Sequence, residues 1–281
     1  MQFAYQSKIS YILPLKVHLN MVVFLMEDRV LVLKFGGASV ASPDCFARIA
    51  DIIIDRQKTY SKVVVVVSAM GDTTDDLLSL AKQVHPHPPK RELDMLVSVG
   101  ERISIALLAM ALSLKGMDAI SLTGSQSGII TTADHSEARI VDVKPFRILK
   151  HLEEGKIVIV AGFQGMSSLK EITTLGRGGS DTSAVALGVS LGALKVEFFK
   201  DVKGVYSEDP KKNPDSKFFS FLTYEEALSI MRAGAEILHV RALELASKNS
   251  LPLYVLSFND PNSGGTLISS FSVLEGNPIY E

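Results

Sequence analysis

The chain has 281 residues, of which 47% are hydrophobic and 21% charged, and its formal net charge is −2. This length fits one large α/β domain or two closely joined lobes, and the composition supports a sizeable core rather than disorder. The charge gives no basic footprint for a nucleic acid. A single cysteine, Cys45, excludes an intrachain disulfide and fits the reducing cytoplasm, and no Cys/His cluster has the spacing of a zinc site.

The first 28 residues contain an apolar stretch that Lys16, His18 and Asn20 interrupt. A membrane span needs about 20 apolar residues, so this stretch is too broken to be one. It also lacks a clear small-residue cleavage site for a signal peptide. We therefore expect residues 1–28 to be a poorly ordered extension or a misassigned start, with the natural start at Met21 or Met26, and we expect no membrane association.

Strand and helix patterns alternate along the rest of the chain. The run 29–35 is rich in β-forming residues, and Ser42 and Pro43 then have the pattern of a helix start. The run 62–68 is apolar throughout, as in a parallel strand that is covered on both faces. Apolar residues recur at helical spacing over 91–115, which predicts one long helix.

The second half continues this alternation. Further strands are expected near 118–122, 128–132, 156–163, 194–199, 251–257 and 265–269, and further helices near 144–152, 181–192, 223–232 and 240–249. Residues 164–180 are expected to form a loop. The alternation predicts an α/β fold, a three-layer α/β/α sandwich with a mainly parallel central sheet. Ligands bind such sheets at the carboxyl ends of the strands, so the loops after the strands are the place to look for a site.

Lys34, Gly36 and Gly37 end the first predicted strand. Glycines let backbone N–H groups approach an anion closely, and the lysine adds a positive charge, which is a pattern typical of phosphate binding. Neither G-x-x-x-x-G-K-[ST] nor G-x-G-x-x-G occurs at this strand. On these residues alone, a glycine turn beside a surface lysine explains the pattern equally well.

Two further segments carry polar groups near the expected site. In the loop 68–75, hydroxyls either contact a substrate or cap the next helix through Thr73 or Thr74. Glu101 and Arg102 interrupt an apolar helix and, as neighbours, diverge by about 100° around its axis. They either form a salt bridge at the helix edge, or Glu101 faces a site and receives an ammonium group.

The segment 174–182 reads TLGRGGSDT. Ser180 has the pattern of an N-cap for a helix that starts at Asp181, and a helix N-terminus favours a negative ligand. Arg177 can bind a carboxylate through two hydrogen bonds. Asp181 would repel an anion, so it fits better as a residue that orients Lys34 or as a group near a metal.

The segment 201–212 is rich in turn residues and contains Asp201 and Tyr206. It either holds a ribose and a base or forms an ordinary hairpin. The G-x-S-x-G elbow of hydrolases and the H-R-D and D-F-G signatures of protein kinases are both absent.

Together these loops resemble the amino acid kinase superfamily and, within it, the aspartokinases. The resemblance runs from about Val30 to Leu267 and rests on seven motifs in this order: KFGGAS, VVVVVSAMGDTTDDLL, VGERIS, TGSQSGIITT, VAGFQG, TTLGRGGSDTSAVALG and DVKGVYSEDP. The segments GERIS and GRGGSDT favour aspartokinases over acetylglutamate, glutamate-5, carbamate and uridylate kinases.

The resemblance implies ATP-dependent, Mg²⁺-assisted phosphorylation of the L-aspartate side chain to 4-phospho-L-aspartate, the first step towards lysine, threonine and methionine. It also implies a cytoplasmic homodimer, with no nucleic-acid partner. Two alternatives stay open: a related kinase with another carboxylate acceptor, and a non-catalytic sensor that binds a nucleotide or an amino acid.

Matching positions carry the family's site residues onto this chain. The resemblance implies that Lys34, Phe35, Gly36 and Gly37 hold the nucleotide phosphates, that Thr74 and Glu101 contact aspartate, and that Arg177, Gly178, Gly179 and Ser180 hold its carboxylates. It further implies that Asp181 positions the catalytic Lys34, and that Lys200, Asp201, Tyr206, Asp209, Pro210 and Lys211 line the nucleoside pocket. No protein residue is expected to bind the metal directly.

Three residues depart from the family pattern. Lys200 stands where threonine or serine is usual, Glu236 where a lysine commonly reaches the nucleotide, and Lys211 where arginine is usual. We expect the catalytic domain at 29–270 and a tail at 271–281, without the ACT regulatory domain that aspartokinases usually carry. This implies an unregulated form, regulation by a separate chain, or a truncated sequence.

Overall fold

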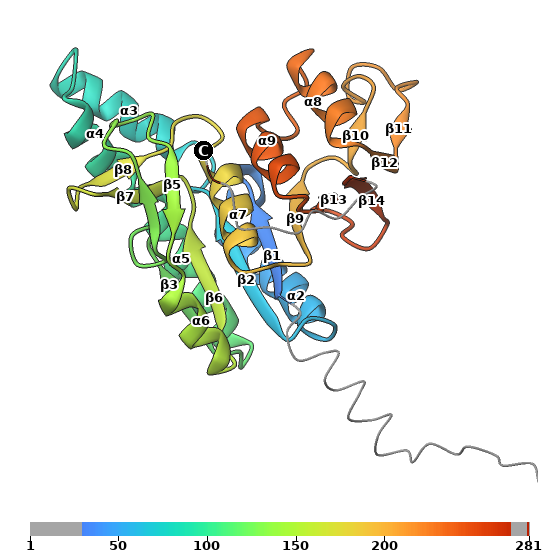
Figure 1. Ribbon diagram of the computed structural model, residues 1–281, viewed down its shortest axis with the longest axis horizontal. Helices are drawn as coiled ribbons and strands as arrows, with labels where there is room; N and C mark the ends of the chain where they lie inside the picture. Colours follow the sequence, from blue (N-terminus) through green and yellow to red (C-terminus); the bar gives the residue numbers. More distant parts are fainter. Residues whose placement is uncertain (1–29, 271–279, 281) are drawn as a thin grey trace, which may run out of the picture.

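The computed structural model of the chain describes residues 30–270 and Tyr280. The expectation for residues 1–28, and most of the expected tail at 271–281, lie outside these described residues. Within them, the expected alternation of strands and helices is confirmed (Figure 1).

The central feature is an eight-stranded sheet with the order β12-β14-β13-β9-β1-β2-β6-β3. Its strands are β1 (Val30–Phe35), β2 (Lys62–Val67), β3 (Ala119–Leu122), β6 (Ile157–Ala161), β9 (Lys195–Lys200), β12 (Phe221–Leu222), β13 (Leu253–Ser257) and β14 (Gly265–Ile268). Every neighbouring pair in this sheet is parallel except β13 with β14. The mainly parallel sheet expected from the apolar runs is therefore confirmed.

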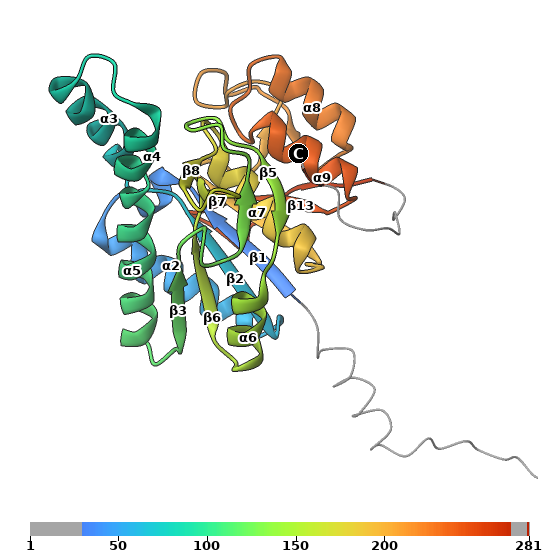
Figure 2. The same ribbon diagram turned by 60° about the vertical axis from the view of Figure 1, so that its left-hand side comes forward.

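Helices cover both faces of this sheet, which gives the expected three layers (Figure 2). One face packs against α2 (Pro43–Gln57) and α5 (Val99–Leu114), and the other against α6 (Phe146–Glu153), α7 (Gly179–Ser190), α8 (Tyr224–Arg232) and α9 (Val240–Lys248). Successive side chains of a strand point to opposite faces, so Leu33 packs on the α2 side and Val32 on the α7 side. Lys34, two residues after Val32, is thereby directed towards α7.

Residues 164–180 are not the expected loop. They contain β7 (Gln164–Ser167) and β8 (Ile172–Thr174), an antiparallel pair. These strands belong to a separate four-stranded sheet, β5-β4-β7-β8, with β4 (Ile129–Thr131) and β5 (Ile140–Val143). The strands are too short for a periodicity signal, and their pairing with β4 is non-local, so the sequence pattern alone does not reveal them.

The helix expected over 91–115 is also corrected. It divides into α4 (Lys90–Val97) and α5, with Ser98 between them. The Ser98 carbonyl accepts a hydrogen bond from Gln164 Nε2 at 2.9 Å, a tertiary contact at the break. The whole stretch Lys90–Leu114 is long and apolar enough to cross a membrane by length and composition, but α5 packs on α2 and β6 as a helix of the core.

Two smaller features complete the fold. Helix α3 (Thr73–Val84) follows β2, and a two-stranded hairpin of β10 (Val205–Tyr206) and β11 (Phe218–Phe219) follows β9. Figure 1 shows α3, α4 and the β7–β8 pair on one side of the molecule, and α8, α9 and the β10–β11 hairpin on the other. The loops that follow β1, β2 and β9 lie at the carboxyl ends of the strands between these two groups.

Candidate active site

A cavity of about 280 Å³ lies at the carboxyl ends of the central strands. Nine of its lining residues belong to the set expected from the sequence: Lys34, Gly37, Thr74, Glu101, Arg177, Gly178, Gly179, Ser180 and Asp181. They come from β1, the 3-10 helix η1 (Gly37–Val40), α3, α5, the segment that joins β8 to α7 and the first turn of α7. Parallel strands bring their carboxyl ends to one edge, which is why loops far apart in sequence meet here.

Asp181 joins two buried lysines in this region. Its Oδ1 lies 2.5 Å from Lys34 Nζ, and its Oδ2 lies 3.6 Å from Lys200 Nζ. Only 5% of the Lys34 side chain and 9% of the Asp181 side chain are exposed. Since β1 and β9 are neighbours in the sheet, both lysines reach the first turn of α7. The structure thus brings together Lys34 and its expected orienting partner, and adds Lys200 to the pair.

The charges of Asp181, Lys34 and Lys200 strongly affect one another. Burial opposes ionisation of Asp181, but Lys34 and Lys200 outweigh burial and lower the pKa of its carboxyl to about 2. Burial also lowers the pKa of Lys200, while the nearby Asp181 carboxylate opposes that effect. With both lysines charged, two cations share one anion, and the group carries an excess positive charge that suits a phosphoryl group.

Helix α7 begins earlier than expected. Its first residue is Gly179 and its N-cap is Gly178, so Ser180 lies in the first turn and does not cap the helix. Gly178 has a φ of +74°, which favours glycine, and a Cβ there would lie 2.1 Å from the His239 ring. This tight left-handed turn sets the start of the helix, and the sequence does not reveal it because it depends on the contact with His239. It places the first turn of α7 at the cavity, where free N–H groups of a helix start favour an anion.

Glu101 lies in the first turn of α5 and is only 3% exposed. Its Oε1 accepts a hydrogen bond from the Ala69 backbone N–H at 3.2 Å, whereas its Oε2 has no hydrogen-bond partner among the described residues. Burial raises the pKa of this carboxyl to about 7. Within the described part of the chain Glu101 forms no salt bridge with Arg102, so the structure favours the expectation that it receives a cation in the cavity.

Of the two roles considered for Thr73 and Thr74, capping of α3 is not observed, because both lie in the first turn of this helix. The N-cap of α3 is Asp72, and the Thr73 hydroxyl donates a hydrogen bond to the Met70 carbonyl at 2.6 Å. Thr74 lines the cavity instead. Its hydroxyl is therefore placed to contact a bound molecule.

One residue expected at the nucleotide belongs to the core. Phe35 is fully buried and stacks on Phe199, with 4.6 Å between the ring centroids. The Phe35 side chain alternates with Lys34 and points to the opposite face of the sheet, so only the backbone of Phe35 is left to hold the phosphates, and its role stays a prediction. Gly36 lies beside the lysine, since a Cβ there would lie 3.5 Å from Lys34 Nζ, an ordinary contact distance.

The other residues expected at the nucleoside lie in the segment after β9, outside the 280 Å³ cavity. Asp201 and Lys211 form an exposed ion pair at 2.5 Å, and Tyr206 packs against Phe218 with ring centroids 5.3 Å apart. Asp209 accepts a hydrogen bond from the Lys211 backbone N–H at 3.0 Å, which fixes the turn around Pro210. This segment continues directly from Lys200, so it borders the lysine cluster.

Sequence reasoning considered Ser68 only among the hydroxyls of the loop 68–75 and assigned no role to four other residues that line the cavity: Ala69, Gly71, Phe163 and Gly176. The position of the loop after β2 predicts that its residues lie near a ligand, because this loop follows the carboxyl end of a buried parallel strand. Phe163 has a φ of +68°, an unusual backbone conformation for a bulky residue, and this has no sequence signal.

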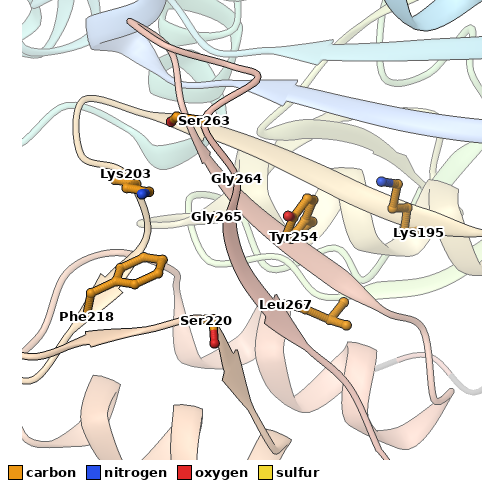
Figure 3. Close-up of a pocket in the computed structure, with 9 residues that line it drawn as sticks. All are labelled: Lys195, Lys203, Phe218, Ser220, Tyr254, Ser263, Gly264, Gly265 and Leu267. Atoms are coloured by element: carbon orange, nitrogen blue, oxygen red, sulfur yellow. The ribbon is translucent and has the colours of Figure 1, made fainter.

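A second cavity, of about 620 Å³, lies where β13 and β14 meet the segment after β9 (Figure 3). It contains no residue of the expected site. Its Lys195 pairs with Glu197 at 2.7 Å and lies over the Tyr254 ring, and its Lys203 lies over the Phe218 ring. The smaller cavity, in contrast, gathers nine of the expected residues and contains Glu101 Oε2, which has no hydrogen-bond partner among the described residues. We therefore take the smaller cavity as the candidate active site.

Comparisons with known proteins identify the family of the chain. Residues 29–257 match the model of the amino acid kinase family. The chain is 49% identical over 242 residues to the aspartokinase of Mycobacterium tuberculosis strain H37Rv (86% of this chain, 58% of that protein) and 48% identical over 250 residues to that of Bacillus sp. strain MGA3 (89% and 61%). It therefore spans about three fifths of the length of these curated relatives.

Solved structures give the same result. Aspartate kinase from Synechocystis superimposes with a TM-score of 0.80 at 42% identity, covering 90% of this chain and 41% of that one. E. coli aspartokinase III in complex with aspartate and ADP superimposes with a TM-score of 0.78 at 27% identity, covering 88% and 66%. The family match covers most of the chain, and the fold and the gathered motifs agree with it. This chain belongs to the amino acid kinase family.

Proposed function

We propose that this chain transfers the γ-phosphoryl group of ATP to the side-chain carboxylate of L-aspartate, giving 4-phospho-L-aspartate and ADP. The observation that carries the proposal is that Glu101, a buried carboxylate with one unpaired oxygen, and the buried Lys34 line one cavity, with Lys200 near the other oxygen of Asp181. Glu101 suits the ammonium group of an amino acid, and Lys34 with Lys200 suits a phosphoryl group. The related aspartokinase III structure contains aspartate and ADP, which supports the same pair of ligands here.

The acceptor would be held from two sides. The ammonium group of aspartate would bind Glu101, with Thr74 nearby, and a carboxylate of aspartate would bind Arg177 and the N–H groups of Gly178 and Ser180. The N–H of Gly179, between them, donates to the Gly176 carbonyl at 3.0 Å. Arg177 is exposed and forms no ion pair among the described residues, so its guanidinium is available. Binding at both ends directs the side-chain carboxylate towards the lysine cluster.

Transfer needs no general base, because the attacking carboxylate is already ionised and nucleophilic. One carboxylate oxygen forms a bond to the γ-phosphorus while the bond from that phosphorus to the bridging oxygen of ADP breaks. The enzyme contributes positioning and charge neutralisation. Lys34 and Lys200, oriented by Asp181, would stabilise the charge on the transferred group.

Mg²⁺ is part of this proposal as the ion that accompanies ATP. Kinases commonly hold Mg²⁺ through the substrate phosphates and few protein ligands. No group of three His, Cys, Asp or Glu side chains in residues 30–270 could hold a metal by itself, and the Asp181 carboxylate is already neutralised by two lysines. These residues fit an ion carried in by the nucleotide rather than a metal site built from the chain alone.

The nucleoside would lie along the segment after β9. We propose that Lys200, Asp201, Tyr206, Asp209, Pro210 and Lys211 border it, since this segment continues from the lysine cluster and its turn is fixed by internal hydrogen bonds. Glu236 is exposed, at the position where a family lysine would reach the nucleotide. Lys200 would then replace the positive charge that this position lacks.

Assembly, regulation and compartment are further parts of the proposal. We propose a cytoplasmic homodimer in which residues 29–270 form the catalytic unit. Light scattering after size-exclusion chromatography tests the dimer. Activity measured with added lysine or threonine tests whether the chain carries an effector site or depends on a separate regulatory chain.

A hydroxamate assay for acyl phosphate tests the function directly. The purified chain, ATP and Mg²⁺ are combined with aspartate, glutamate or N-acetylglutamate in parallel, with Lys34→Ala as the inactive control. We expect acyl phosphate with aspartate and a strong loss in the control. Product with another acid would identify a kinase of different acceptor, and ATP binding without product from any acid would identify a sensor.

A further inference from the structure

Asp94 is a fully buried carboxylate that the proposed mechanism does not use. It lies on α4, has an exposed fraction of 0%, and does not line the candidate active site. Burying a carboxylate is unfavourable unless hydrogen bonds satisfy its oxygens. A buried carboxylate at this position therefore suggests a specific structural role.

Four donors from two distant segments satisfy Asp94. Thr174 Oγ1 donates at 2.6 Å, from the last residue of β8, and His135 Nδ1 contacts Oδ2 at 2.7 Å. The Ser136 backbone N–H lies 3.1 Å from both oxygens, and the Ser136 hydroxyl donates at 3.2 Å. These donors are 41 to 80 residues away in sequence, so Asp94 joins α4 to β8 and to the loop before β5.

Both joined segments support the loop that we propose for the acceptor. Thr174 is followed directly by Leu175 and Gly176. The carbonyl oxygen of Ser136 lies only 3.0 Å from where a Cβ of Gly176 would be. Ser136 also has a φ of +70°, a conformation that is unfavourable for serine and persists where surrounding contacts enforce it. Here the contacts are its bonds to Asp94.

We propose that Asp94 is a positioning residue for the acceptor-binding loop 176–180. It fixes the end of β8 and the backbone of Ser136, and these two supports set where Gly176 turns and where Arg177 begins. The inference rests on the proposed function, because it assumes that this loop holds the acceptor. Asp94 itself touches neither substrate.

Asp94→Asn is the central variant, since an amide keeps the shape but turns two donors towards the donors of Ser136 and Thr174. Glu197→Gln is the matched control. Glu197 is equally buried, at 2%, and is bonded to Arg56 Nε at 2.7 Å and Lys195 at 2.7 Å, within β9 and away from the candidate active site. Both variants lose a buried, fully bonded carboxylate, but only one lies beside the acceptor loop.

Steady-state kinetics provide the first measurement. We expect Asp94→Asn to raise the KM for aspartate about tenfold, in line with losing a hydrogen bond to a charged group, and to change the KM for ATP by less than about threefold. Glu197→Gln should leave both values within about twofold. Equal effects of Asp94→Asn on both substrates, or an unchanged KM for aspartate, would overturn the proposal.

Hydrogen exchange followed by mass spectrometry provides a measurement that needs no turnover. In Asp94→Asn the amides of 174–181 should exchange faster than in wild type while those of 195–198 do not change, and Glu197→Gln should show the reverse. Uniform loosening, or no change in 174–181, contradicts a positioning role. If the wild type shows no kinase activity, the proposed function fails, but this comparison still tests the inference.

A milder variant covers the case in which Asp94→Asn does not fold. Thr174→Val removes one donor and keeps Asp94 and the side-chain shape. We expect a smaller change in the same direction, about threefold in the KM for aspartate, with faster exchange confined to 174–181. Kinetics and exchange like those of wild type would overturn the proposal.

Discussion

Asp181 and Lys34 form an ion pair of 2.5 Å, almost closed to solvent, at the start of α7. Burying either charge alone would be unfavourable, because each loses its contact with water. The carboxylate compensates the lysine and restricts its ammonium group to one position. The pair therefore explains how a cation is held and oriented in a closed site.

Replacing Asp181 by Asn should remove that restraint. We expect kcat to fall by about 10²–10³, the range seen when a preorganised charge-stabilising group is lost. Asp51→Asn is the control, since Asp51 pairs with Lys115 in an exposed ion pair, and it should keep full activity. Stopped-flow or coupled ADP assays measure both. A kcat for Asp181→Asn within fivefold of wild type would show that Lys34 needs no partner.

The raised pKa of Glu101 predicts the pH dependence of acceptor use. Only the ionised carboxylate attracts an ammonium group, and the pKa of about 7 means that lower pH protonates it. We therefore expect kcat/KM for aspartate to fall up to about tenfold per pH unit below pH 7 and to level off above it. Glu101→Gln should give a low value without this slope. A variant that keeps the wild-type slope would assign the titration to another group.

Lys200 should contribute to phosphoryl transfer. We expect Lys200→Met to raise the KM for ATP and lower kcat, together on the order of tenfold to a hundredfold in kcat/KM, because one of two cations at the site is lost. Lys203→Met is the matched control: it removes a lysine three residues later that lies over the Phe218 ring. Similar losses in the two variants would indicate a general effect of surface charge on ATP binding.

Glu236→Lys tests whether the nucleotide site lacks a positive charge. If Lys200 only partly replaces that charge, the added lysine should lower the KM for ATP by about threefold to tenfold through its attraction to the phosphates. Glu225→Lys, on α8, makes the same charge change elsewhere and controls for net charge. An unchanged or raised KM in Glu236→Lys would contradict a simple account of missing charge.

Gly178→Ala should destabilise the fold more than a comparable glycine substitution. Gly178 and Gly192 both have positive φ, +74° and +60°, so alanine strains either position by about 1–2 kcal/mol. Only at Gly178 would the new Cβ collide with the His239 ring, whereas Gly192 has no heavy atom within 4 Å of the same position. We expect about 1–3 kcal/mol of additional loss at Gly178. Urea unfolding of both variants measures the difference, and equal losses would show that the ring moves aside freely.

The sequence predicts the central sheet well because its strands are buried on both faces. Runs such as 62–67 then contain little but valine, and no partner is needed to recognise them. Lys34 and Arg177 also stand out in the sequence, because each is a charged residue beside a glycine-rich segment that follows a strand, and Glu101 stands out because it lies in an apolar helix. A charged residue that differs from its neighbours in the sequence can be recognised without the structure.

Features that depend on distant partners are not visible in this way. The helix break at Ser98 involves Gln164, and the start of α7 at Gly179 depends on space beside His239. Asp94 looks like an ordinary polar residue of an amphipathic helix until His135, Ser136 and Thr174 are placed around it. Such contacts are set by tertiary packing, which local patterns do not encode.

The separate four-stranded sheet has a consequence for how this fold can change. Lys34 and Lys200 belong to strands of the large sheet, whereas the stem that leads to Arg177 belongs to β8 of the small one. We therefore expect substitutions in the small sheet to reshape the pocket that we propose for the acceptor while Lys34 and Lys200 keep their places. The small sheet, with its supports at Asp94 and Ser136, is therefore the part of the fold in which changes of acceptor specificity are expected to arise, in evolution or by design.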